Sequence, residues 1–299
     1  MTAPPYADTY AAWMPYVTSE EFKQSATGVD VGQLVPGGST AQNNAALVTI
    51  LGRASNYADN LCQQVLAATQ QTENGQIAAD RWGRWLLLPK QWPCLQLVAA
   101  QFQPVSGGSA YPVSVSTAII EKTRIIIPTT GTLGATSSAG PLQFGSIAPL
   151  AESYGQWTYI AGWPNTPLAA NCTQNATSLT VTSPLGIYPG SLLTIYDADL
   201  TEQVTVAPSY VIGSTTIPLV SGTLFAHATV TGPSLSAMPP AIKQAVIALA
   251  VALIKTRGAE AFAMAGIMEQ ADKKEEATPG GIEEFDLAAD LLVPFHAVR

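Results

Sequence analysis

The feature that most constrains this chain is an apolar stretch near its C-terminal end. The stretch opens at Pro239-Pro240, and no polar residue follows Gln244 up to Ile254. It is too short to cross a bilayer, which needs about 20 apolar residues. A helix that is apolar all round must instead be covered on every side. We therefore predict a core helix within residues 237–277, with contacts made by Ile242, Val246, Leu249 and Leu253.

An acidic tail, residues 278–299, follows this helix and begins at the helix breaker Thr278-Pro-Gly-Gly281. Burying a large apolar side chain gains roughly 1.5–3 kcal/mol, whereas ordering each residue costs about 1–2 kcal/mol. The tail therefore needs a surface to dock on, either in its own domain or on a partner. Helical spacing groups Ile282, Phe285, Ala289 and Leu292 on one side and Glu283, Asp286 and Asp290 on another.

Charge is scarce and unevenly distributed. Charged residues make up 11% of the chain and apolar ones 47%, so much of the surface is built from uncharged polar residues or is covered by other chains. The net charge of −8 argues against affinity for a nucleic-acid backbone. No lysine or arginine lies between Arg124 and Lys243. DNA that passed this segment would slide past without being held.

The three cysteines, Cys62, Cys94 and Cys172, are widely spaced and form no Cys-x-x-Cys pair. An odd number without metal-ligand spacing favours reduced, buried thiols in a protein made in the cytoplasm. The N-terminus shows no basic region followed by an apolar stretch, so no secretory signal is visible.

Two helices are expected in an N-terminal helical segment, residues 1–76. The first begins at a capping box formed by Thr18 and Glu21, with Val17 and Phe22 as a hydrophobic staple, and stops near Gly28. The second has Ser39 or Thr40 as its N-cap and ends before Thr72. Its apolar stripe comprises Leu47, Ile50, Leu51, Ala54, Ala58, Leu61, Cys62 and Val65.

Strand patterns dominate the middle of the chain. A β-rich segment, residues 77–165, contains short β-branched or aromatic runs at 82–88, 94–102, 112–120, 124–127 and 156–161. Residues 166–236 read as an inserted lobe with runs at 177–182, 191–196, 202–207, 215–219 and 226–230. We predict an α+β fold in which N- and C-terminal helices pack together around a β-rich middle with an inserted small β-barrel or sandwich lobe.

Candidate catalytic residues are few. His227 is expected to have a structural role in a strand, and His296 has no patterned partner. Asp197, Asp199 and Glu202 form the one acidic cluster, which would suit a glycosidase or a calcium site. Turn formation is the better interpretation, because aspartate favours turns and the cluster lacks the glycine and later glutamate of a calcium loop. No cofactor, metal or enzymatic activity is predicted.

Several segments together resemble the head-to-tail adaptor (connector) proteins of long-tailed phages, especially those of actinobacteria. The resemblance is one of layout over most of the chain, including the N-terminal helix pair, with moderately specific motifs from about residue 156 to 257. The motifs are YIAGWPNTPL at 159–168, GIYPGSLLTIYD at 186–197 with TEQVT at 201–205, and LFAHA at 224–228 leading to MPPAIKQA at 238–245.

The resemblance implies a non-enzymatic ring protein of the virion neck, usually in twelve copies. Such a ring joins the portal to the stopper or tail while genomic DNA passes through without sequence-specific binding, and no membrane is involved. The alternatives are another tail component (stopper, terminator or tube protein) or, less favoured, a carbohydrate-active module of the cell envelope. Family adaptors commonly grip the portal through their C-terminal segment, which here implies Ile282, Phe285, Leu287, Leu291, Leu292, Phe295 and Arg299.

Overall fold

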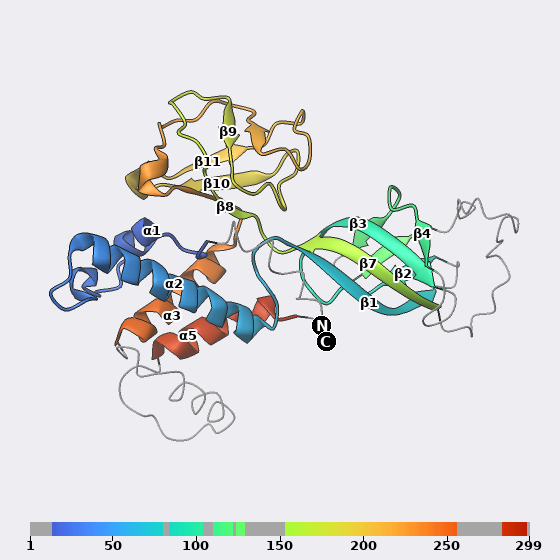
Figure 1. The fold of residues 1–299 in the computed structure, drawn as a ribbon, viewed down its shortest axis with the longest axis horizontal. Helices are drawn as coiled ribbons and strands as arrows, with labels where there is room; N and C mark the ends of the chain where they lie inside the picture. The colour runs from blue at the N-terminus through green and yellow to red at the C-terminus, as the bar shows by residue number, and fades with distance from the viewer. Residues whose placement is uncertain are drawn as a thin grey trace, which may run out of the picture. The chain divides into compact units, whose positions relative to one another are not determined.

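A computed structural model describes residues 14–79, 84–103, 110–121, 124–128, 153–255 and 283–297 (Figure 1). The chain divides into two compact units, and the mixed α+β class is confirmed. The first unit combines Met1–Gln63 with Pro164–His296, and the second contains Gln64–Trp163 and Ala297–Arg299. The predicted hinge at 278–281, together with Ile282, Trp82 and Arg299, lies outside the described residues.

Helices from both ends of the chain meet in the first unit. They are α1 (Ser19–Gln24), α2 (Thr40–Cys62), α3 (Pro240–Lys255) and α5 (Glu283–Leu292), with short 3-10 turns at η2 (Val31–Gln33) and η6 (Val293–Phe295). α3 packs against both α2 and α5, and α5 also contacts α2. Ile242, Val246 and Leu249 of α3 are buried, as expected for an apolar helix, whereas Leu253 is only partly covered.

The predicted starts of α1 and α2 are confirmed, but their predicted ends are not. Thr18 and Glu21 form the predicted capping box, and Ser39 caps α2 in a second box with Gln42. α1 stops at Gln24 rather than near Gly28, because the Ser25 backbone turns to an extended conformation. α2 stops at Cys62, where Gln63 adopts a left-handed conformation with φ 55°. The predicted extension of α2 toward Thr72 is therefore wrong, and a strand begins at Thr69.

The inserted lobe is built from six short strands in two sheets. β11 (Glu202–Thr205), β10 (Leu192–Tyr196), β13 (Ser234–Ser236) and β8 (Asn165–Pro167) form one sheet, and β12 (Thr216–Pro218) pairs with β9 (Ser178–Thr180). An isolated β-bridge between Leu168 and Val181 pairs the end of β8 with the end of β9. A second bridge, between Val206 and Leu219, pairs the end of β11 with the end of β12. The hydrogen-bonded neighbours thus form a closed cycle, which leaves none of these strands with a free edge along its whole length.

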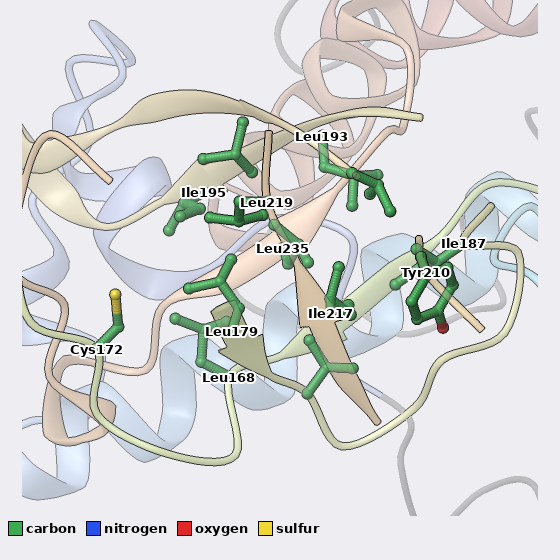
Figure 2. Packing of buried hydrophobic residues seen from close by; sticks show 13 residues of the cluster. Leu168, Cys172, Leu179, Ile187, Leu193, Ile195, Tyr210, Ile217, Leu219 and Leu235 are labelled. Atoms are coloured by element: carbon green, nitrogen blue, oxygen red, sulfur yellow. The ribbon is translucent and has the colours of Figure 1, made fainter. Parts of the chain in front are cut away.

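The interior of the lobe is apolar (Figure 2). Alternate residues of β10 point inward, so that Leu193 and Ile195 are fully buried while Leu192 is exposed. One prediction fails in this part of the chain, and one strand was not expected. Residues 226–230 form no strand, since the described backbone there has a single bridge from His227 to Cys172 and a 3-10 turn, η5 (Thr229–Thr231). β13 was not anticipated, because its Ser-Leu-Ser sequence has little strand preference.

In the described part of the second unit, seven strands form one sheet in the order β4-β3-β7-β1-β2-β6-β5. The most polar strand, β1, was missed at sequence level because it has no alternating apolar pattern; it is held by pairing with β7 and β2. Trp85 stacks on Phe102 in the core of this unit. The strands are β1 (Thr69–Ala79), β2 (Trp85–Leu87), β3 (Cys94–Gln103), β4 (Tyr111–Val113), β5 (Ile119–Glu121), β6 (Arg124–Ile127) and β7 (Ser153–Ala161).

Candidate functional site

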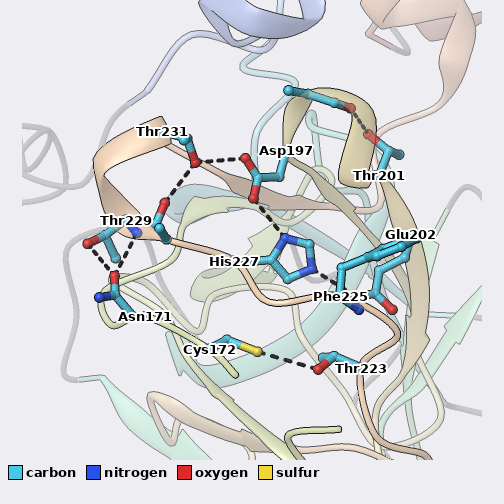
Figure 3. A network of polar contacts seen from close by, with 12 residues as sticks. Asn171, Cys172, Asp197, Thr201, Glu202, Thr223, Phe225, His227, Thr229 and Thr231 are labelled. Carbon is cyan, nitrogen blue, oxygen red and sulfur yellow. Dashed lines mark hydrogen bonds and ion pairs between the residues drawn. The ribbon is translucent and has the colours of Figure 1, made fainter. Parts of the chain in front are cut away.

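A buried histidine joins two of the acids that the sequence singles out (Figure 3). His227 Nδ1 lies 2.8 Å from Asp197 Oδ2, and Nε2 lies 2.8 Å from Glu202 Oε1. Asp197 follows β10 and Glu202 opens β11, so the turn between these strands, η4 (Ala198–Leu200), brings the two carboxylates to either side of the ring. All three side chains are almost completely buried.

The hydrogen bonds of this network pair polar atoms that are buried away from water. Each ring nitrogen of His227 lies within hydrogen-bond distance of one carboxyl oxygen. Burying a polar group is costly unless it is hydrogen-bonded, and all three side chains are partnered here.

The same carboxylates also anchor a neighbouring stretch of backbone. Glu202 Oε2 accepts a hydrogen bond from the Leu224 amide at 2.7 Å, and Oε1 accepts one from the Phe225 amide at 3.2 Å. Asp197 Oδ1 accepts from the Thr231 hydroxyl at 2.7 Å. We call residues 223–231 the clamped segment, because buried charges hold it near both ends and at His227 in its middle.

Two further contacts complete the clamped segment. The Asn171 side-chain oxygen accepts hydrogen bonds from the amide and the hydroxyl of Thr229 at 2.8 and 2.9 Å. The Thr223 hydroxyl donates to the Thr173 carbonyl at 2.9 Å. Side-chain contacts thus help to hold a segment whose regular structure is limited to one β-bridge and a 3-10 turn.

This geometry leaves the acidic network poorly suited to chemistry on a substrate. A general base must reach the proton it removes, yet both nitrogens of His227 are engaged and the acids are buried. Among the residues that the structure describes, no group of three or more histidine, cysteine and acidic side chains is arranged to hold a metal ion. The arrangement instead joins two strands to the clamped segment.

Asp199, the third member of the predicted acidic cluster, is separate from this network. Its side chain is exposed and accepts a hydrogen bond from Gln24 Nε2 of α1 at 3.1 Å. The sequence therefore grouped three acids that the fold divides, two into the interior of the lobe and one onto its surface.

A second buried ionic contact, which the sequence did not reveal, centres on Lys243 of α3. Its ammonium donates to Glu21 Oε1 at 2.7 Å and to the Tyr16 carbonyl at 3.0 Å, and it lies 3.7 Å from the centre of the Tyr196 ring. Burial lowers the pKa of Lys243, and the carboxylate of Glu21 opposes that shift. One side chain thus joins the C-terminal helix, the N-terminal segment and β10 of the lobe.

Glu21 performs two roles in this contact. Its Oε2 accepts the Thr18 amide at 2.8 Å in the capping box, while its Oε1 binds Lys243. The capping box was visible in the sequence. The ion pair of Glu21 with Lys243 was not visible, because nothing in local spacing links Glu21 to a residue of α3.

The predicted docking tail finds a surface in its own unit. Phe285 and Leu292 are buried, the ring of Phe285 meets Tyr57 edge to face, and the Cys62 thiol lies 3.9 Å from the Leu292 carbonyl oxygen. Lys255 at the end of α3 pairs with Glu284. Of the two alternatives left open by the sequence, docking on its own domain is the one described. Leu291 and Phe295 are partly covered, while Leu287 remains exposed.

The three cysteines are free and buried, as predicted. Burial raises the pKa of both Cys62 and Cys94 to about 12, so these thiols are poor nucleophiles in the folded protein. His296, the second histidine, lies at an exposed position after η6.

Within the described ranges, no helix has the length and apolar character required to cross a bilayer. Comparison of the chain with models of known protein families, with curated proteins and with solved structures returns no match.

Proposed function

We propose that this chain is a structural subunit of a phage virion neck, a head-to-tail adaptor that forms a ring between the portal and the stopper or tail. Genomic DNA passes through the ring without sequence-specific contact. The subunit is made in the host cytoplasm and takes its place at the junction of head and tail.

The observation that carries this proposal is the use made of buried charge in the first unit. His227, Asp197 and Glu202 fix a loop of the lobe, and Lys243 links Glu21 of α1 and its own helix α3 to Tyr196 of that lobe. These groups hold parts of the chain together and are not open to a substrate. Such a construction suits a subunit whose task is to keep a shape under mechanical load.

The distribution of charge gives further support. The lobe contains no lysine or arginine, and its only carboxylate outside the buried network is that of Asp199. A surface with so little charge neither grips a phosphate backbone nor repels it strongly. The motifs that carry the resemblance lie between about residues 156 and 257, mostly in the lobe and α3, which Lys243 connects.

The portal contact is proposed to use the C-terminal segment. Its apolar face is covered by α2 and α3. The large apolar side chains of the described part that are exposed to a partner are those of Leu287 and Val293, at 48% and 60%. We expect the variant L287S/V293S to fold normally and to lose binding to the portal. The variant V48S/L88S, altered at exposed apolar positions of α2 and the second unit, is the matched control.

Portal binding is measured by co-sedimentation of the purified chain with assembled portal rings. Loss of binding in L287S/V293S but not in the control supports the tail contact. Equal binding by both variants would remove these residues from the portal contact. Deletion of residues 280–299 is less informative, because it also uncovers the apolar sides of α2 and α3 and can unfold the unit.

A further inference from the structure

The surface of the β lobe combines very low charge with exposed apolar side chains. The lobe has three acids and no lysine or arginine, and two of those acids are buried around His227. The exposed charge that remains, Asp199, is hydrogen-bonded to Gln24. The buried network therefore has a second consequence, which is that it removes charge from the outside of the lobe.

Two exposed apolar residues flank Thr205 of β11 from the strands on either side of it. Leu192 of β10 pairs in register with Thr205, and the amide of Val220 donates to the Thr205 carbonyl at 2.9 Å. Leu192 is 57% exposed and Val220 62% exposed, whereas their chain neighbours Leu193 and Leu219 point into the core. We call Leu192 and Val220 the strand patch.

A second patch belongs to the clamped segment. Leu224 and Phe225 are 63% and 37% exposed, although both of their amides are fixed by the buried carboxylate of Glu202. We call these two residues the clamp patch. Apolar side chains on a backbone that is already ordered lose little further entropy on binding, which is a property of interaction surfaces.

The charge of the lobe restricts what can cover these patches. A strongly charged partner would find no complementary charge there and would lose hydration without compensation. The partner surface must itself be nearly uncharged and apolar. The lobe of another copy meets this requirement, and two copies that each carry a net charge of −8 repel least where their surfaces are neutral.

We infer that the strand patch and the clamp patch are the contact surface between the lobes of two copies of this chain. This contact between copies deepens the proposed function. It rests on that function only in one respect, which is that the assembly it belongs to is the ring of the virion neck. A contact of this kind is driven by burial of apolar area, with ion pairs contributing little.

The test compares four forms of the full chain by sedimentation velocity over a range of concentrations at low and high ionic strength. They are the wild type, L192S/V220S, L224S/F225S and the control V48S/L88S, and thermal unfolding confirms that each is folded. The wild type and the control should self-associate, and added salt should not weaken them. Each lobe variant should weaken association by about tenfold or more, since two apolar side chains then stay in water.

The inference is overturned if the wild type is monomeric at every concentration, if both lobe variants associate like the wild type, or if salt dissociates the assembly. Binding of the lobe patches to portal rings by an otherwise monomeric chain would assign the surface to the portal and would also overturn it. The outcome is separable from that for the proposed function, because self-association is measured without any virion component. A chain that associates through its lobes but is absent from the neck would refute the function alone.

Discussion

Tyr196 presents its ring to the ammonium of Lys243 at 3.7 Å, while the next residue, Asp197, binds His227 inside the lobe. Two adjacent residues at the end of β10 thus serve the two buried ionic contacts of the first unit. One contact joins the lobe to helices from both ends of the chain, and the other orders the clamped segment. A substitution in the first contact should therefore affect the packing of the lobe and the helices, and one in the second should affect the clamped segment.

Replacing Lys243 by Met should destabilise the first unit by about 3 kcal/mol, because Glu21 is left largely buried without its cation. The measurement is the free energy of unfolding from urea titration. The double variant K243M/E21Q should recover part of the loss, since no unpaired charge remains. A loss in the double variant equal to the sum of the two single losses would show that the ion pair contributes nothing.

Replacing His227 by Leu should cost about 3–5 kcal/mol, because two buried carboxylates would lose the group that compensates them. Asp197 and Asp199 offer a matched pair of substitutions in one turn. D197N should be strongly destabilising, whereas D199N should stay within about 0.5 kcal/mol of the wild type. Equal effects of the two would contradict the division of the acidic cluster into buried and exposed members.

Truncating the buried face of α5 should destabilise the chain, whereas truncating its exposed face should not. Leu292→Ala is expected to cost about 2–5 kcal/mol because its side chain is fully buried. Leu287→Ala, on the outer face of the same helix, should change the unfolding free energy by less than about 0.5 kcal/mol. Similar small effects for both would mean that the tail is not docked on its own unit in solution.

Alkaline pH should weaken the folded state in part through Cys62. Burial raises the pKa of this thiol from 9.0 to about 12, so the folded state keeps its proton at pH values where the unfolded state loses it. The resulting contribution to stability is fully present below pH 9 and is lost as the pH rises toward 12. Urea titrations at neutral and alkaline pH should show a larger loss for the wild type than for C62A.

The sequence predicted those parts of the fold that depend on local chemistry. The capping box at Thr18, the helix start at Ser39 or Thr40, the apolar helix and the strand at Arg124–Ile127 follow from neighbouring residues alone. β1 could not be predicted, because its polar residues form a strand only through pairing with β7. The end of α2 was missed because the helix stops at the left-handed residue Gln63, and no glycine or proline marks that position in the sequence.

The contacts of the candidate site likewise could not be predicted from neighbouring residues alone. Asp197 and Glu202 were identified as unusual, but their partner His227 lies in a loop that the sequence assigned to a strand. The contact of Lys243 with Glu21 joins residues from opposite ends of the chain. A lysine at the start of an otherwise apolar helix was the available signal, because such a charge must find a partner when the helix is buried.

Electron microscopy of virions labelled with gold-conjugated antibody against the β lobe would show whether this chain is a neck adaptor. We expect label in a ring at the junction of portal and tail, in contact with the portal. Label along the tail tube, at the tail tip, or absent from the virion would contradict it.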